Sequence, residues 1–310
     1  MSKSTQRLME KKNMEQIRNL GDANKITREY FDSLLIEMRH IDGVLPDTKL
    51  QIYGEIFDTP IMTAALSHLN SCHEDGMVEM ARGAKSANAV MWAGMGDDAE
   101  LERITATGAK TIKIIKPYAD NNEIFRKITH AEKNGCIAVG MDIDHSFNHA
   151  GEYDVIHGLH MSGKTQQEIS QFVKATKLPF IIKGILSTQD AVKCLEAGVN
   201  GIVVSHHHGI LDFATPPLMV LPEIVKAIGN KMPIFVDCGL ESGIDVFKAL
   251  ALGASAISLG RVIMGPLSEN GAEGVKKIIQ HQTVELASAM ARTCSSDIAH
   301  IDPSVIRKKF

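Results

Sequence analysis

The sequence predicts an α/β protein built on a (β/α)8 barrel of the TIM type, with a helical extension before it. Short runs rich in Ile, Val and Ala recur from residue 60 onward, and an amphipathic stretch with helical spacing follows each of them. Eight such units over about 230 residues match the size of this fold. An open, doubly wound sheet is the alternative, but no Gly-rich dinucleotide fingerprint follows the first run.

The apolar runs predict strands that are buried on both faces, as in a parallel sheet covered by helices. They occupy residues 60–66, 89–94, 111–116, 136–142, 179–184, 201–205, 233–237 and 256–260. Ahead of them, residues 5–20 and 26–38 have helical spacing, and residues 50–58 predict a short hairpin. We therefore divide the chain into an N-terminal extension (1–58), the barrel (59–290) and a C-terminal tail that packs on the barrel (291–310).

Composition excludes several classes of protein. The 310 residues carry a net charge of -4, with 44% hydrophobic and 23% charged residues, which is ordinary for a globular protein and argues against a nucleic-acid partner. No apolar run reaches the roughly 20 residues that cross a bilayer, and no signal peptide is apparent, so no membrane partner is expected. The five cysteines are scattered and odd in number, which favours free thiols and a cytoplasmic location.

Two long connections follow the fourth and sixth predicted strands, at residues 143–164 and 206–217. Both leave the carboxyl end of a barrel strand, which is where active sites of this fold are built. The second begins with three consecutive histidines, His206, His207 and His208. Histidine titrates near neutrality and can act as a general base, and three in a row at a barrel mouth favour such a function. Solvated histidines at a polar strand end are the alternative.

Other strand ends carry polar residues as well. Asp142 closes the fourth strand and could orient a histidine and stabilise its protonated form, or merely cap the next segment. Lys183 closes the fifth strand, where a buried ammonium group needs an anionic partner; a lysine that reaches solvent is the alternative. No metal is expected, because the pairs His145/His149 and His157/His160 lie in no recognisable ligand motif.

Glycine-containing turns follow the last two predicted strands, at residues 237–243 and 259–261. In barrels these loops frequently bind phosphate through backbone N–H groups, and Arg261 adds a fixed positive charge. Glycine alone is a weak signal, because tight turns need it anyway.

Taken together, the segments 183–185, 201–209, 221–224, 237–239, 243–254 and 260–261 resemble the FMN-dependent 2-hydroxy-acid oxidase and dehydrogenase family. The resemblance implies a barrel with FMN at its C-terminal mouth, a small-molecule substrate and a homotetramer. It implies that His207 is the catalytic base and Asp142 its carboxylate partner. It further implies a set of FMN-contacting residues: Ala64, Ala65, Leu66, Lys113, Lys183, Ser205, Asp237, Gly239, Gly260 and Arg261.

The sequence differs from that family at the residues that bind the substrate carboxylate. The family's arginine after the catalytic histidine is absent, residues 143–161 contain no arginine, and Ile115 or a neighbour replaces a strand-three tyrosine. Because a bidentate arginine is the strong way to hold a carboxylate, we expect an altered substrate specificity. His206, His208 and His145 are the candidates for replacement contacts.

Two other functions stay open at this point. One is an FMN-dependent isomerase similar to the type 2 isopentenyl-diphosphate isomerase. The His-x-Asn-x-x-Gln-Glu segment of that family is matched only weakly, by residues 147–152. The other is a flavin-binding protein without catalysis, which the retention of His207 disfavours.

Overall fold

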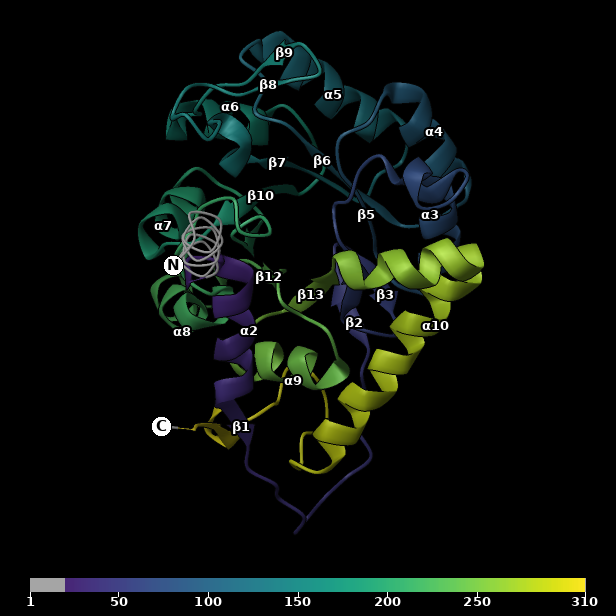
Figure 1. The fold of residues 1–310 in the computed structure, drawn as a ribbon, viewed down its shortest axis with the longest axis vertical. Helices are drawn as coiled ribbons and strands as arrows, with labels where there is room; N and C mark the ends of the chain where they lie inside the picture. The colour runs from purple at the N-terminus through teal and green to yellow at the C-terminus, as the bar shows by residue number, and fades with distance from the viewer. Residues whose placement is uncertain (1–19, 310) are drawn as a thin grey trace, which may run out of the picture.

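The computed structural model describes residues 20–309, and these form a ring of parallel strands with helices around its outside (Figure 1). The helix expected over residues 5–20 lies outside the described residues, apart from its last position. The (β/α)8 barrel predicted from the sequence is confirmed.

Eight parallel strands form the ring, in the order β4-β13-β12-β11-β10-β7-β6-β5. A parallel bridge between Leu66 and Ala93 joins the two ends of this order and nearly closes the barrel. Every predicted apolar run coincides with one of the strands, and only β10 extends beyond its run, by one residue. They are β4 (Ile61–Thr63), β5 (Met91–Ala93), β6 (Thr111–Ile115), β7 (Ala138–Asp142), β10 (Phe180–Ile185), β11 (Gly201–Val204), β12 (Ile234–Val236) and β13 (Ala256–Leu259).

Helices follow the strands and pack against their outer face. They are α3 (Gly76–Ser86), α4 (Asp98–Ala106), α5 (Asn121–Lys133), α6 (Gln166–Lys174), α7 (Thr188–Glu196), α8 (Pro217–Ile228), α9 (Gly243–Ala251) and α10 (Met264–Ala291). Capping side chains fix the starts of several of them: Thr165 and Glu168 form a capping box on α6, and Ser187 accepts from the backbone of Asp190 on α7.

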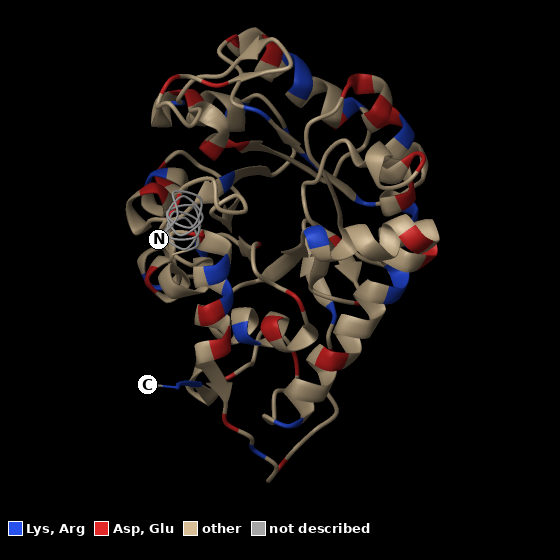
Figure 2. Ribbon diagram, viewed as in Figure 1, with Lys and Arg blue, Asp and Glu red and all other residues tan. Residues whose placement is uncertain are grey.

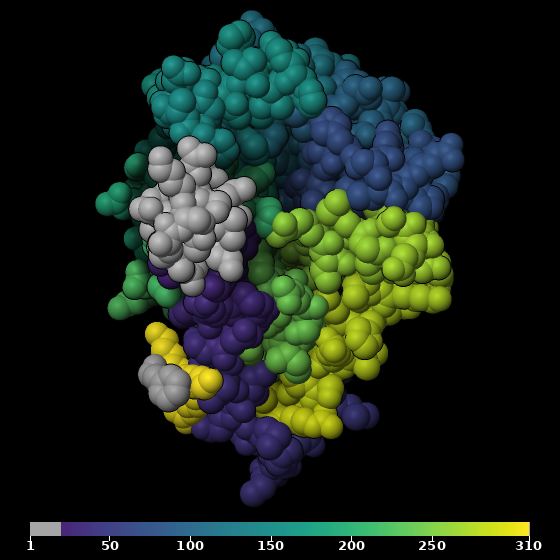
Figure 3. Space-filling model, in the orientation of Figure 1, coloured from purple at the N-terminus to yellow at the C-terminus, as the bar shows by residue number. Residues whose placement is uncertain are grey.

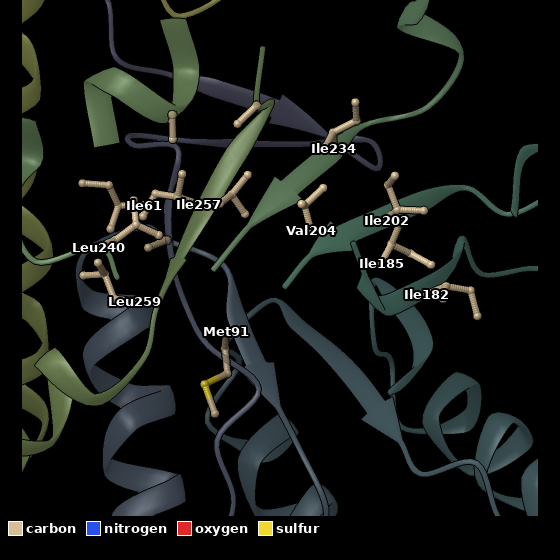
Figure 4. Close-up of a cluster of buried hydrophobic side chains, with 14 of the residues drawn as sticks. Ile61, Met91, Ile182, Ile185, Ile202, Val204, Ile234, Leu240, Ile257 and Leu259 are labelled. Carbon is tan, nitrogen blue, oxygen red and sulfur yellow. The ribbon is translucent and has the colours of Figure 1, made fainter. Parts of the chain in front are cut away.

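Side chains along the barrel strands alternate between two apolar layers, because successive residues of a strand face opposite sides. Inward-facing residues fill the barrel, among them Ile114, Ile181, Val203 and Phe235. Their neighbours face outward and pack against the helices. Figure 4 shows part of this outer layer, with Ile61, Met91, Ile182, Ile185, Ile202, Val204, Ile234, Leu240, Ile257 and Leu259 labelled.

The N-terminal extension contains α2 (Ala23–Ser33), β1 (Leu34–Ile36) and the predicted hairpin, β2 (Leu50–Ile52) with β3 (Glu55–Phe57). The helix expected over residues 26–38 therefore ends earlier than predicted. Its last residues instead form β1, which pairs with the C-terminal strand β14 (Ile306–Lys308). This pairing joins the N-terminal extension to the C-terminal tail, and Figure 1 shows the C-terminal strand beside β1.

The loops at the mouth contain the short helical turns η2 (Ile143–Ser146) and η4 (Arg261–Ile263) and a small hairpin, β8 (Val155–Ile156) with β9 (Leu159–His160). Further short turns are η1 (Leu69–Ser71), η3 (Gly229–Lys231) and η5 (Pro303–Val305). Acidic and basic residues are spread over the outer helices (Figure 2), and one face of the molecule is hollowed near its centre (Figure 3). Within residues 20–309, no helix combines the length and apolarity needed to span a bilayer.

Candidate active site

Polar side chains replace the apolar ones where five neighbouring strands reach the mouth of the barrel. Each lies two residues beyond an inward-facing residue, so the strand alternation turns it toward the inside. All are buried despite their polarity. They are Lys116, Asp142, Lys183, Ser205 and Asp237, from the ends of β6, β7, β10, β11 and β12.

Asp142 is the centre of this polar layer. Its Oδ2 accepts a hydrogen bond from Lys116 Nζ at 2.7 Å, and its Oδ1 lies 3.3 Å from Lys183 Nζ and 3.2 Å from His207 Nδ1. Burial alone would raise the pKa of Asp142, but the two ammonium groups and the imidazole hold it well below the ordinary value. Asp142 is therefore a carboxylate at all physiological pH values.

Lys183 contacts a partner on every side. Its Nζ lies 3.3 Å from Ser205 Oγ, 3.2 Å from His207 Nδ1 and 3.6 Å from Asp237 Oδ2, in addition to its contact with Asp142. Burial opposes its charge, yet the surrounding carboxylates raise the pKa of Lys183 well above its ordinary value. It is a permanent, buried cation at the mouth.

His207 is held through one ring nitrogen. Its Nδ1 lies 3.0 Å from Asp144 Oδ1 and 3.2 Å from Asp142 Oδ1, so this nitrogen carries a proton that it donates to carboxylate. The backbone has a φ of 47° and donates to Ser205 Oγ at 3.1 Å, which fixes the turn. Burial and Lys183 oppose protonation of the ring, but the carboxylates prevail and raise the pKa of His207 to about 9.

The second ring nitrogen of His207 meets another imidazole. Its Nε2 lies 2.8 Å from Nε2 of His145, which comes from η2 in the long loop after β7, and the two rings cross at 85°. Burial, together with the charge of Lys116, lowers the pKa of His145 to about 4. A neutral His145 therefore accepts the proton that His207 donates.

Asp144 is the second carboxylate beside the base. Burial and the neighbouring Asp142 raise its pKa, and its Oδ2 is buried without a hydrogen-bond partner among residues 20–309. The loop approaches β10 so closely that a Cβ on Gly184 would lie 2.6 Å from the carboxyl carbon of Asp144. Gly184 also has a φ of 97°, so glycine is needed there for both reasons.

Asp142, His145 and His207 present possible metal-ligand atoms within 4.8 Å of one another. Two ammonium groups already neutralise the one carboxylate of this set, because Lys116 and Lys183 both contact Asp142. A divalent cation would have to displace them, so we assign no metal to these residues.

The three consecutive histidines have three different environments. Both ring nitrogens of His206 are engaged, by Thr27 Oγ1 at 2.8 Å and by the backbone N–H of Gly209 at 2.9 Å. His208 is exposed and its Nδ1 accepts from Arg261 at 2.7 Å. His206 therefore holds the loop against α2, and His208 lies with Arg261. That these two histidines bind substrate stays a prediction.

The two glycine-containing turns lie next to one another at the rim. A Cβ placed on Gly260 would meet no atom within 4 Å, so the backbone at this point borders open space. Arg261 follows it with an exposed guanidinium. Gly239, with a φ of 76°, is covered by α2, whose Arg28 donates to its carbonyl oxygen at 2.9 Å and to the Asp245 carboxylate at 2.8 Å.

Two more sequence-predicted segments can be placed. Ala64, Ala65 and Leu66 follow β4 at the mouth, where Ala64 is buried and the next two residues are partly exposed. Lys113 points outward from the barrel: its Nζ donates to the carbonyl oxygen of Gly94, and burial lowers its pKa to about 8 among charges from α4 and α5.

The inward-facing residues of β6 are Ile112 and Ile114, so the odd-numbered Lys113 points to the helices. That Lys113 contacts the flavin stays a prediction, which this outward orientation does not favour. The lysine that β6 brings to the mouth is Lys116, which sequence reasoning missed.

Comparison with known proteins identifies the family of this chain. The sequence profile of the FMN-dependent dehydrogenases matches residues 12–168 and 160–308. The chain belongs to this family. Glycolate oxidase of Spinacia oleracea is 27% identical over 317 residues, covering 90% of this chain and 86% of its own length. A peroxisomal (S)-2-hydroxyacid oxidase of Arabidopsis thaliana is 29% identical over 295 residues, covering 84% of this chain and 81% of its own.

Solved structures give the same family. A mandelate oxidase variant with (S)-mandelic acid superposes with a TM-score of 0.84 and 26% identity, covering 94% of this chain and 90% of that chain. Another, with an FMN adduct, has a TM-score of 0.83 and 28% identity, covering 93% and 92%. The protein is thus an FMN-dependent oxidoreductase of the family that oxidises CH–OH groups, and its cofactor is FMN.

The residues of this FMN-dependent dehydrogenase fit that cofactor. The open backbone at Gly260 with the guanidinium of Arg261 suits a phosphate group. The small side chains of Ala64 and Ala65 leave room for a flat ring at the rim. The buried cation Lys183 suits negative charge on a reduced flavin.

Sequence reasoning missed four residues of the site. Lys116 and Asp144 contact the base or its carboxylate, and Thr27 and Arg28 hold the loops from α2. Lys116 could have been found by counting two residues from Ile114 along the inward face of β6. The contacts of α2 have no such signal, because they join residues about 180 positions apart.

Proposed function

We propose that the protein oxidises the C–OH group of a 2-hydroxy acid, with His207 as the base and Asp142 as its carboxylate partner. The observation that supports this most is the arrangement of His207: its Nδ1 is occupied by carboxylates, so Nε2 is the nitrogen that exchanges a proton. His207 acts as the base in the form in which Nε2 has lost the proton that it shares with His145. Bound FMN supplies the acceptor for the two electrons of the substrate C–H bond.

The residues around the base have separate tasks in this proposal. The substrate hydroxyl replaces His145 at Nε2 of His207, which is where that imidazole lies in the structure. Asp142 and Asp144 keep the proton on Nδ1 and stabilise the imidazolium that forms when His207 accepts the substrate proton. Lys183 would stabilise negative charge on bound FMN when the cofactor is reduced.

We further propose that the substrate differs from the usual short hydroxy acid, because the two family arginines are missing from the sequence. We also propose that the protein is a homotetramer. A cytoplasmic location is a further proposal, because relatives include peroxisomal enzymes. Size-exclusion chromatography with light scattering would test the first, and cell fractionation the second.

Anaerobic bleaching of the bound yellow flavin by glycolate, lactate and mandelate tests the reaction directly. At least one acid should reduce the FMN, and His207→Ala should slow that reduction by about 10²–10⁴-fold while the protein stays yellow. His160→Ala, which removes an exposed histidine from β9, is the matched control and should react as the parent does. Reduction at the parental rate in His207→Ala would move the base to another residue.

A further inference from the structure

A substrate carboxylate that is buried beside FMN needs a cation or strong hydrogen-bond donors, since an unpaired buried charge is costly. The arginines that serve relatives are absent from the sequence. The replacement must therefore be found among the cations that face the base at the mouth of the barrel.

Lys116 has the donors for this task. Its ammonium group has three N–H donors, and within residues 20–309 its one hydrogen-bond partner is Asp142 Oδ2 at 2.7 Å. The residue is 9% exposed, so the two remaining donors are largely removed from solvent. Buried donors that lack a partner in the protein indicate a ligand with acceptor atoms.

The other cations near the mouth are already engaged. Lys183 contacts Asp142, Ser205, His207 and Asp237. Lys164 donates to the carbonyl oxygen of Tyr118 and to the side chains of Asn121 and Ser162. Arg261 lies at the rim with His208. His145 is uncharged at neutral pH, because its pKa is about 4.

The position of Lys116 also fits the shape of a 2-hydroxy acid. Lys116 and His207 are held by the two oxygens of one carboxylate, that of Asp142, so they lie side by side. The hydroxyl and the carboxylate of the substrate are on adjacent carbon atoms. A molecule with its hydroxyl on His207 can therefore reach Lys116 with its carboxylate.

We propose that Lys116 binds the carboxylate of the substrate and determines the preference of this enzyme for anionic substrates. This inference rests on the proposed function. A lysine is a point charge rather than a planar fork, so it selects negative charge while imposing less orientation than a bidentate arginine does. The enzyme should therefore accept acids of varied shape but discriminate against their neutral amides.

The test measures binding of oxalate, a small dianion without a C–H bond to oxidise, from the change it causes in the visible spectrum of bound FMN. Lys116→Met should raise the Kd of oxalate by at least about 30-fold, and Lys116→Arg by less than about 5-fold. Lys127→Met is the matched control, because Lys127 has the same 11% side-chain exposure and is paired with Asp98 at 2.8 Å. It should leave the Kd of oxalate unchanged.

A second measurement separates substrate binding from a merely structural effect on Asp142. The preference for mandelate over its amide, measured as the ratio of kcat/KM values, should collapse in Lys116→Met, whereas damage to the base would slow both compounds alike. Unchanged oxalate affinity and an unchanged ratio would overturn the inference. If Lys116→Met loses its FMN, Lys116→Gln measured against Lys116→Arg decides by the same two criteria.

The failure of the proposed function would look different. In that case neither a 2-hydroxy acid nor oxalate would change the flavin spectrum of the parent protein, and both proposals would fall together. Bleaching of the parent by an acid, with normal oxalate binding in Lys116→Met, would overturn the role of Lys116 alone.

Discussion

Two neighbouring layers inside the barrel differ completely in chemistry although the same strands build them. The lower layer is formed by Ile114, Gly140, Ile181, Val203 and Phe235, and it is apolar. One step further along each strand, two residues on, the inward positions become Lys, Asp, Lys, Ser and Asp. A strand can therefore pass from an apolar core position to a polar position of the candidate active site within two residues.

The layers also differ in how they affect stability. Burial of the lower layer stabilises the fold by removing apolar surface from water. The upper layer buries charges, which costs free energy unless each charge is paired. Asp142 makes this possible because its two oxygens serve Lys116, Lys183 and His207 at once.

The largest effect on stability is expected from breaking the upper layer at Asp142. Asp142→Ala leaves Lys116 and Lys183 without their shared carboxylate, and we expect it to lower the free energy of unfolding by about 3–5 kcal/mol. Urea denaturation followed by circular dichroism measures this. A loss below about 1 kcal/mol would mean that the ammonium groups find other partners.

The lower layer should respond with a smaller loss of stability. Ile181 is completely buried, and Ile181→Ala should lower the free energy of unfolding by about 2–4 kcal/mol through lost burial and a cavity. The variant should nevertheless bind FMN and be reduced by substrate at close to the parental rate, as stopped-flow absorbance would show. A large loss of reduction rate would show that the two layers are not separable.

The pH dependence of stability tests the charged upper layer separately from the apolar lower layer. The folded pKa of His207 is raised from the model-compound 6.5 to about 9, so its stabilising contribution is complete below about pH 6.5 and is lost as the pH rises through 9. The difference in unfolding free energy between the parent and His207→Gln should shrink by about 1–3 kcal/mol between pH 6 and pH 10. Lys113 titrates in both proteins, so its contribution to the pH dependence cancels when the unfolding free energy of one is subtracted from that of the other. A difference that stays constant over this range would contradict the raised pKa.

The smallest effect is expected at the surface, where an ion pair is exposed to water. Lys193 and Asp190 lie 3.3 Å apart, but their side chains are 59% and 51% exposed. Lys193→Ala should therefore change the free energy of unfolding by no more than about 0.5 kcal/mol, measured in the same urea experiment. A larger change would mean that this exposed ion pair contributes to stability as the buried pairs at the mouth do.

The sequence allowed the strands and part of the site to be predicted, because both depend on local pattern. Apolar runs identified all the barrel strands, and the rule that parallel strands end at one rim brought Asp142, Lys183 and His207 together. The flavin contact of Lys113 was inferred from the family resemblance, whereas the alternation along β6 turns this side chain outward. Counting positions from Ile112 would have selected Lys116.

Other features depend on contacts between distant parts of the chain and have no local signal. The residues after Ser33 continue the helical spacing, yet they pair with β14 from the other end of the chain. His206 was expected to meet substrate because it neighbours His207. Only the position of Thr27 on α2 shows that its ring is already engaged.

The hydrogen bonds from α2 to the loops after β11 and β12 have a consequence for how the enzyme folds and takes up its cofactor. Thr27 contacts His206 at a sequence separation of 179 residues, and Arg28 contacts the backbone of Gly239 at a still larger separation. A segment that leaves the ribosome early must therefore wait for most of the polypeptide to emerge before it can dock. Uptake of the yellow chromophore should be among the last events of folding, and its colour would report that the first and last parts of the chain have met.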